Sequence, residues 1–221
     1  MSWVWEQSAR SRHESVTVNP APSRAVTESD HTGRSARRAT IESRRIYSGR
    51  VLQLDVDTVR FPNGSVGELE IIRHPGASAV VPILDSPDET DPRLLLIRQY
   101  RYAADGFLYE IPAGRLDDGE DPLECALREL REETGFTAGV VEPLGGFFTT
   151  PGFIDEFIHA YVASALIPGE SRLERDEFIS VETHRLSSTM EMIARGEIVD
   201  GKTIVALFLA DHQRRGRLQE S

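Results

Sequence analysis

The stretch RELREETG, Arg128 to Gly135, crowds carboxylates into one short segment. If this segment is helical, Glu129 and Glu133 are i, i+4 neighbours, about 40° apart around the helix axis. Like charges at that spacing repel each other by a few tenths of a kcal/mol. A solvated helix face is the usual explanation of such a pair. The neighbouring residues must therefore decide whether these acids do chemistry.

The residues around the acids predict a helix over residues 122–134. Asp121 is expected as the N-cap, Pro122 as the first helical residue, and Gly135 just past the end. Apolar side chains recur at i, i+3, i+4 and i+7 and supply a buried face: Leu123, Ala126, Leu127 and Leu130. The glutamates lie off that face, so a second element must position whatever they bind.

A loop leads into the start of this helix and brings further oxygen ligands with it. It carries Gly114, Asp117, Asp118 and Glu120. Several carboxylates beside a glycine turn suit Mg²⁺ or Mn²⁺, and such cations relieve the repulsion between the acids. A metal site therefore stands beside the solvated helix face as an alternative explanation of the acids.

The same residues resemble the Nudix box, the signature of the Nudix hydrolases. The match runs from Gly114 through five residues to Glu120, then seven residues to the segment Arg128–Phe136, which reads RELREETGF. The one departure is Phe136, where the family usually has an aliphatic residue. The wider resemblance covers roughly residues 45–215. It implies an α/β protein with a Nudix-type α/β/α sandwich on a mixed β-sheet, together with a small N-terminal β-element.

The resemblance also implies roles for individual residues. The implied metal ligands are Glu129, Glu132, Glu133 and the carbonyl of Ala113. Arg128 and Glu120 correspond to an internal ion pair of the box, and Arg128 and Glu132 are also counted among the catalytic residues. The implied cofactor is Mg²⁺, with Mn²⁺ as a substitute. The implied reaction is hydrolysis of a nucleoside diphosphate linked to another group.

Features outside the box resemble the ADP-ribose pyrophosphatase branch of the family. Pro151 lies sixteen residues beyond Gly135, RQYR ends in Arg101, and GEIVDGKTIVAL follows near the C-terminus. In that branch the arginine contacts the substrate, and Pro151 marks the substrate site. Each feature also has a structural alternative: Pro151 ends a strand, Arg101 pairs with a surface acid, and DGKT caps a helix.

The loop TTPGFIDE resembles the catalytic loop of that branch, and its glutamate is Glu156. The box carboxylates are committed to cations, so a further group is wanted to take the proton from the attacking water. Asp155 is the rival base. If a strand begins here, the two acids point to opposite faces and only one reaches the water. The remaining alternative is that both are solvated loop acids.

Three segments are expected along the chain. Residues 1–43 are rich in Ser, Arg, Thr and Pro, and this composition predicts a flexible extension. Residues 44–76 predict a small β-element with a turn at residues 62–64. In the resembling branch this element exchanges between two subunits, which implies a homodimer and makes Tyr47, Glu70 and Arg73 candidate substrate contacts. Residues 77–215 are the expected hydrolase domain.

Strands and helices alternate along that domain. Strands are expected near residues 77–84, 93–101, 107–114, 141–150, 156–166 and 178–186, and further helices near 187–195 and 202–214. Interleaved helices and hairpin-length gaps indicate a mixed sheet.

Composition narrows the class of protein. The net charge is −11, although residues 1–50 hold nine Arg and five acidic residues. An acidic body argues against a nucleic-acid partner. The longest apolar runs are too short to span a bilayer, and the single cysteine, Cys125, fits a reducing compartment, so a cytoplasmic protein without a membrane partner is expected.

Three functions compete. The first is hydrolysis of ADP-ribose, giving AMP and ribose 5-phosphate. The second is a Nudix pyrophosphatase for other nucleotide sugars, such as GDP-mannose, or for oxidised nucleotides. The third is a non-catalytic module that senses such ligands, against which the intact box argues. A serine hydrolase is unsupported because no G-x-S-x-G segment occurs, and the six histidines show no zinc spacing.

Overall fold

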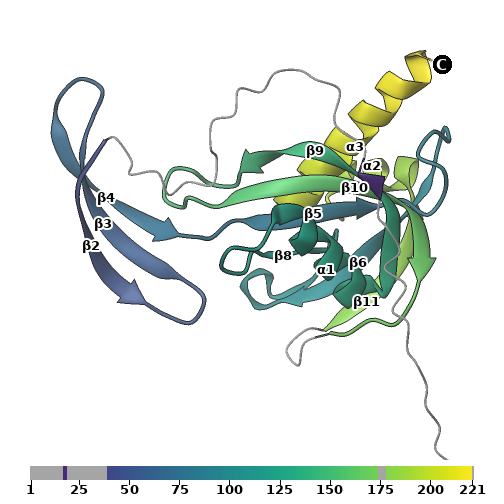
Figure 1. Cartoon of the computed structure of the whole chain (residues 1–221), viewed down its shortest axis with the longest axis horizontal. Helices are drawn as coiled ribbons and strands as arrows, with labels where there is room; N and C mark the ends of the chain where they lie inside the picture. The colour runs from purple at the N-terminus through teal and green to yellow at the C-terminus, as the bar shows by residue number, and fades with distance from the viewer. Residues whose placement is uncertain (1–16, 19–38, 174–177, 221) are drawn as a thin grey trace, which may run out of the picture.

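A mixed sheet forms the centre of the molecule (Figure 1). The computed structural model describes residues 17–18, 39–173 and 178–220. The order of the five central strands is β1 (Thr17–Val18), β9 (Phe136–Phe148), β10 (Phe157–Pro168), β5 (Ala77–Pro82) and β8 (Ala113–Arg115). β10 runs parallel to β5 but antiparallel to β9, and β5 runs antiparallel to β8. The sheet is therefore mixed, as predicted.

Helices cover both faces of this sheet. Val80 of β5 packs with Ala126 and Leu130 of α1 (Pro122–Thr134) in one core cluster. Its neighbours on β5 face the other way and pack with side chains of α2 (Leu186–Ala194) and α3 (Gly201–Glu220) in a second cluster. Because successive strand residues point to opposite faces, a wholly buried β5 must be covered twice. The expected α/β/α sandwich is confirmed.

A second sheet completes the body. It consists of β11 (Ile179–Arg185), β6 (Arg93–Arg101) and β7 (Gly106–Glu110), with the 3-10 turn η1 (Tyr102–Ala104) between β6 and β7. The isolated bridge between Ile83 and Leu94 joins the ends of the two sheets. Leu94 and Leu96 are fully buried in the larger core cluster. This packing anchors the first half of β6, and Arg101 is the last residue of the strand, at its other end.

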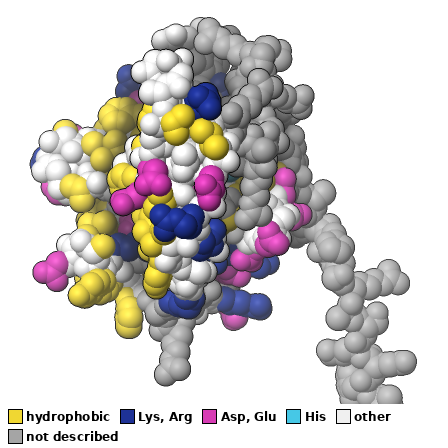
Figure 2. Space-filling model, turned by 90° about the vertical axis from the view of Figure 1, so that its left-hand side faces the viewer, with side chains coloured by type: hydrophobic (Ala, Val, Ile, Leu, Met, Phe, Trp, Pro, Cys, Tyr) yellow, Lys and Arg dark blue, Asp and Glu magenta, His cyan; other side chains and the backbone are white. Residues whose placement is uncertain are grey.

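Three antiparallel strands form a sheet that projects from the body: β2 (Thr40–Ser48), β3 (Gln53–Arg60) and β4 (Val66–Arg73) (Figure 1). The predicted turn between β3 and β4 is present, with Gly64 at φ 85°. Hydrophobic side chains are exposed at this end of the molecule (Figure 2), including Tyr47, Val51 and Leu52. The sheet therefore presents apolar surface that this chain leaves uncovered in the described residues.

The predicted flexible extension, residues 1–43, falls almost wholly outside the described residues. Its described parts lie in strands: Thr17–Val18 pairs parallel with Val140–Val141 of β9, and β2 begins at Thr40. The boundaries of the three expected segments stay predictions. None of the helices in the described ranges combines the length and apolarity needed to cross a bilayer.

Candidate active site

Helix α1 begins and ends where the sequence predicts. The Asp121 carboxylate accepts hydrogen bonds from the backbone N–H groups of Leu123 at 2.8 Å and Glu124 at 3.4 Å. Gly135 takes a left-handed conformation, φ 77°, and its N–H bonds to the Arg131 carbonyl. These caps satisfy groups that the first and last turns leave unpaired. The packing of Ala126 and Leu130 against Val80 sets the rotation of the helix, and with it the direction of its acids.

Two of the box glutamates are buried against β8. Glu129 is 8% exposed and Glu133 is 3% exposed. Glu133 Oε2 accepts a hydrogen bond of 3.0 Å from the Ala113 N–H. A Cβ atom on Gly114 would lie 1.8 Å from Glu129 Oε1, so no other residue fits at that position without displacing the carboxylate. The helix and β8 therefore enclose these acids together.

Arg128 connects three carboxylates of the site. Its Nε and Nη2 atoms donate to the two oxygens of Glu120 at 2.8 Å and 3.0 Å, which confirms the expected ion pair. Its Nη1 atom donates to Glu129 Oε1 at 2.6 Å and to Glu132 Oε2 at 3.3 Å. The hydrogen bonds from Arg128 lower the pKa of Glu120 to about 2. Glu120 therefore stays ionised and keeps Arg128 beside the other carboxylates.

The donor set suits a hard divalent cation. Carboxylates and a backbone carbonyl are the ligands that Mg²⁺ and Mn²⁺ prefer. Glu129 and Glu132 lie close together, because both contact the same Arg128 nitrogen. Across the described ranges, however, no three acidic, histidine or cysteine side chains are already gathered around one point. The site thus has the chemistry for a cation, and its acids accept hydrogen bonds from Arg128 and from the Ala113 N–H.

Arg101 lies at the end of β6 and is held by a buried acid that the sequence analysis did not single out. Its Nε and Nη2 atoms donate to the two oxygens of Glu110 at 2.7 Å and 2.8 Å. Glu110 is 1% exposed. The alternative in which Arg101 pairs with a surface acid is therefore wrong, because its partner is buried. Lys202 also donates to Glu110, and to Asp200 at 3.0 Å. Arg101, Glu110, Lys202 and Asp200 form a charge-balanced cluster, called here the Glu110 cluster.

The electrostatics of the Glu110 cluster follow from its pairing. Burial pushes the pKa of Glu110 upward, but Arg101 and Lys202 lower it overall. The hydrogen bonds to Glu110 raise the pKa of Arg101, and the negative charge of Glu133 raises it further. Arg101 is therefore electrostatically coupled to the acids of α1, although β6 and α1 are separate in the sequence.

The alternative role proposed for DGKT, capping a helix, is confirmed. Asp200 Oδ2 accepts from the Thr203 N–H at 3.0 Å and from the Thr203 hydroxyl at 2.6 Å at the start of α3. Thr203 Oγ1 in turn accepts from the Ile111 N–H at 3.0 Å. The cap therefore ties the start of α3 to the strand end next to Glu110. A single buried glutamate in FLYEIPAG was the sequence signal that could have found this link.

The loop between β9 and β10 is fastened to the projecting sheet. The Ile72 N–H donates to the Phe153 carbonyl at 2.8 Å, and the Asp155 N–H donates to the Ile72 carbonyl at 3.2 Å. At its base, the Thr149 N–H bonds to the Glu156 carbonyl at 3.3 Å. Pro151 is exposed near the tip of this loop. These hydrogen bonds hold the loop against β4.

The two candidate bases in this loop have different surroundings. Asp155 Oδ1 accepts from the His74 N–H at 2.7 Å, and its Oδ2 lies 3.4 Å from Arg73 Nη1. Glu156 Oε2 accepts from the Thr149 hydroxyl at 2.8 Å. The carboxylate of Asp155 is engaged by a cation and a backbone donor, whereas that of Glu156 is engaged by a neutral hydroxyl.

The residues predicted on the N-terminal element are divided between two environments. Tyr47 and Glu70 are exposed on the projecting sheet, and no contact found among the described residues joins them to α1. Arg73 is instead enclosed by carboxylates, with Asp55 at 2.9 Å and Asp57 at 2.5 Å. Arg73 therefore joins β3, β4 and the β9–β10 loop, which the sequence did not reveal.

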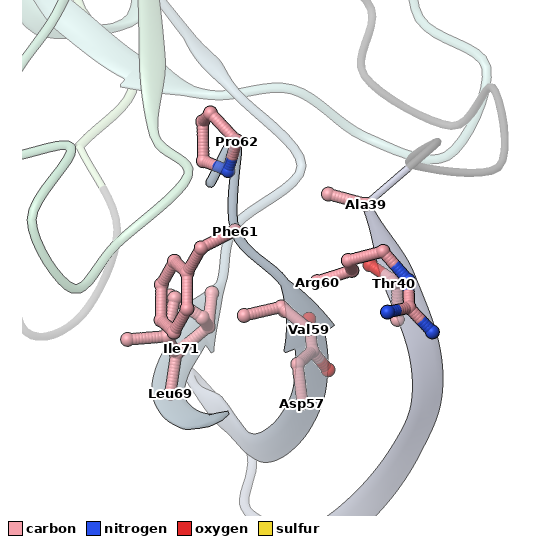
Figure 3. Close-up of a pocket in the computed structure, with 9 residues that line it drawn as sticks. All are labelled: Ala39, Thr40, Asp57, Val59, Arg60, Phe61, Pro62, Leu69 and Ile71. Carbon is pink, nitrogen blue, oxygen red and sulfur yellow. The ribbon is translucent and has the colours of Figure 1, made fainter. Parts of the chain in front are cut away.

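A pocket of about 230 Å³ lies within the projecting sheet (Figure 3). Its apolar lining comes mainly from Val59, Phe61, Leu69 and Ile71. None of the predicted site residues lines it. The pocket is therefore separate from the acids of α1.

Comparisons with known proteins agree with this geometry. The NUDIX domain family matches residues 73–206. The chain is 43% identical over 170 residues to a methanol dehydrogenase activator of Bacillus methanolicus, covering 76% of this chain and 89% of that protein. It is 38% identical over 176 residues to an ADP-ribose pyrophosphatase of Bacillus subtilis (strain 168), covering 79% and 92%. A crystal structure of an ADP compounds hydrolase superposes with a TM-score of 0.69 at 24% identity, covering 80% of this chain and 94% of that one.

Proposed function

Because the chain belongs to the Nudix family, as one of its pyrophosphatases, we propose that it hydrolyses the diphosphate bond of ADP-ribose, giving AMP and ribose 5-phosphate. The observation that carries this proposal is the enclosure of Glu129 and Glu133 by Ala113 and Gly114, with Arg128 beside them. The activity named for the Bacillus subtilis relative supports the choice of substrate.

The cofactor of the proposed reaction is Mg²⁺, with Mn²⁺ as a substitute. Its ligands are Glu129, Glu132, Glu133 and the carbonyl of Ala113. Bound there, a divalent cation neutralises the diphosphate and lowers the pKa of a bound water. Arg128 and Glu120 keep the carboxylates in position, since the two form a bidentate pair that also contacts Glu129 and Glu132.

Glu156 is the proposed general base. Asp155 is tied to Arg73 and to the His74 N–H, so its carboxylate is already used to fasten the loop. Glu156 has no cation among the hydrogen-bond donors identified for it in the described chain, and it accepts from the Thr149 hydroxyl. It is therefore the acid of this loop that is available to accept a proton from water.

Arg101 is the proposed contact to the substrate phosphates. Glu110 engages its Nε and Nη2 atoms, while no hydrogen bond is found for Nη1 within the described residues. The side chain remains 41% exposed. An arginine held on one edge presents its remaining N–H groups in a fixed direction, which suits a phosphate oxygen. Pro151, exposed near the tip of the β9–β10 loop, is a further proposed substrate contact.

The proposed assembly is a homodimer in the cytoplasm, without nucleic-acid or membrane partners. The exposed apolar side chains of the projecting sheet, among them Tyr47 and Val51, support a dimer, because contact with a second copy removes them from water. In such a dimer Tyr47 and Glu70 contact the nucleotide at the other subunit's site, and Arg73 holds the sheet in place.

Product analysis tests the reaction. The purified chain is incubated with ADP-ribose and Mg²⁺, and the products are separated by anion-exchange chromatography, with an EDTA control. Equal amounts of AMP and ribose 5-phosphate, lost with EDTA, are expected. Binding of ADP-ribose without turnover would instead indicate the non-catalytic module.

A further inference from the structure

The short connection between β4 and β5, residues 74–76, brings a histidine to the candidate base. His74 is partly buried, with its side chain 17% exposed. Its Nε2 atom lies 3.6 Å from Glu156 Oε1. The reaction proposed above gives this residue no role. His74 lies between β4 of the projecting sheet and β5 of the central sheet, and this position brings it to the β9–β10 loop.

A backbone contact fixes which ring nitrogen carries the proton. The Gly76 N–H donates to His74 Nδ1 at 3.2 Å. A backbone amide can only donate, so Nδ1 accepts and the proton of the neutral ring is on Nε2. Gly76 has φ 100°, a conformation that favours glycine and turns the chain at this point. The proton on Nε2 therefore points toward Glu156.

Burial favours the neutral form of His74. Burial lowers its pKa, the carboxylates of Glu156 and Asp155 oppose that change, and the positive charge of Arg115 supports it. The net effect is a lowered pKa. The ring is then a neutral donor at neutral pH, and Nδ1 remains free of a proton to accept from Gly76.

Two neutral donors thus flank the Glu156 carboxylate. The Thr149 hydroxyl bonds to Oε2 at 2.8 Å, and the imidazole faces Oε1 at 3.6 Å. The second separation is longer than a hydrogen bond, but contacts of catalytic groups are often long without substrate and shorten in the complex. The backbone of His74 also holds the neighbouring acid, because its N–H bonds to Asp155.

We propose that His74 is a positioning residue: its neutral Nε2–H orients Glu156 so that this carboxylate accepts the proton of the attacking water. The inference rests on the proposed function, in which Glu156 is the base. His74 exchanges no proton with substrate in this scheme. Its effect on the rate passes entirely through Glu156, and that condition can be tested.

The test is a double-mutant cycle with ADP-ribose and saturating Mg²⁺. Glu156→Gln is expected to lower kcat by about 10²–10⁴-fold. His74→Ala is expected to lower kcat about tenfold with KM changed less than about twofold, because the base is misplaced but present. In the double variant, kcat should equal that of Glu156→Gln alone. His74→Gln keeps an N–H donor and should recover most of the loss.

His184→Ala is the matched control. This histidine is also partly buried, and its Nε2 atom lies 3.2 Å from Glu182 on β11, away from the β9–β10 loop. Its replacement should leave kcat unchanged. Melting temperatures are measured for every variant, and if His74→Ala is unfolded the same cycle is read with His74→Asn, whose shorter side chain does not bring its amide to the position of Nε2.

The outcomes separate this inference from the function on which it rests. If the losses of His74→Ala and Glu156→Gln multiply, His74 acts independently of Glu156 and the inference is overturned while the base assignment stands. If Glu156→Gln has normal kcat, the base assignment and the inference both fail. If the unmodified chain does not hydrolyse ADP-ribose, the proposed function fails first. Equal kcat in the double variant and Glu156→Gln, with recovery in His74→Gln, supports the inference.

Discussion

Glu133 on α1 accepts a hydrogen bond from the backbone N–H of Ala113 on β8, with 3.0 Å between the two atoms. This bond aligns the acidic helix with the strand whose carbonyl is the fourth proposed metal ligand. It also gives the buried Glu133 carboxylate a hydrogen-bond donor, and a buried acid without a donor is costly.

Replacing Glu133 by Gln should lower turnover by about a hundredfold, the order of loss expected when a metal site is impaired. The amide oxygen of Gln can still accept from Ala113, so the melting temperature should change little. The measurement is kcat at saturating Mg²⁺, with Glu124→Gln on the exposed first turn of α1 as control. Near-normal turnover would rule out Glu133 as a ligand.

Replacing Gly114 by Ala should disable the site by sterics alone. The added Cβ would lie 1.8 Å from Glu129 Oε1, and the carboxylate is held between β8 and α1. Both kcat and the melting temperature should fall. Gly216→Ala is the control, because no atom lies within 4 Å of its added Cβ; there a gain of about 0.5–1 kcal/mol in unfolding free energy is expected. Normal activity of Gly114→Ala would contradict the packing described.

Glu120 should give the fold a defined acid sensitivity. Its pKa is about 2 in the folded chain, against an ordinary value of 4.5, because Arg128 donates to it. Since the folded pKa is the lower one, the stabilisation is complete above about pH 4.5 and is lost as pH falls toward about 2. Glu120→Gln should be less stable by about 1–2 kcal/mol at neutral pH.

Urea unfolding between pH 2 and pH 7 measures this difference. The difference in unfolding free energy between the unmodified chain and Glu120→Gln should become smaller as the solution becomes more acidic. A gap that stays constant across the range would show that the ionised carboxylate is not the source of the stability.

Lys202→Met should expose the role of the Glu110 cluster. Glu110 would lose one of two cationic partners while remaining buried, which costs roughly 1–3 kcal/mol of unfolding free energy. Arg101 would then carry the whole charge of Glu110 and bind phosphate less well, so KM for ADP-ribose should rise several-fold with a smaller change in kcat.

Lys202→Arg keeps a positive charge beside Glu110, so it should restore part of the unfolding free energy and part of the affinity for ADP-ribose. Arg195→Met is the control, since Arg195 pairs with exposed Glu191 and Glu197 on the surface. If Lys202→Met matches this control in stability and KM, the cluster does not orient Arg101.

The sequence was most informative where a structural feature is local. The α1 caps, the turn at Gly64 and the Arg128–Glu120 pair all join residues at most eight positions apart, and all are present. Helix α3 extends to Glu220, beyond the predicted end at residue 214, and β9 begins at Phe136, directly after the reversal at Gly135. The early start of β9 follows from its pairing with β10, and beyond residue 214 the mostly exposed end of α3 contacts β9 through Arg217 and Glu142. Local propensity records neither contact.

The sequence was least informative where the site joins distant segments. Lys202 reaches Glu110 across 92 positions, and the His74 N–H reaches Asp155 across 81. A pattern of residue types gives no distance between such groups. Arg73 shows the consequence, because a predicted substrate contact is enclosed by Asp55 and Asp57. Only the fold reveals which charges neutralise one another.

The central claim is that ADP-ribose is the preferred substrate, and kcat/KM measured with Mg²⁺ for ADP-ribose, GDP-mannose and 8-oxo-dGTP tests it most directly. The account predicts the highest kcat/KM for ADP-ribose, through the Arg101 contact and the Glu156 loop. A higher kcat/KM for GDP-mannose or 8-oxo-dGTP would contradict it and move the protein to another branch of the family.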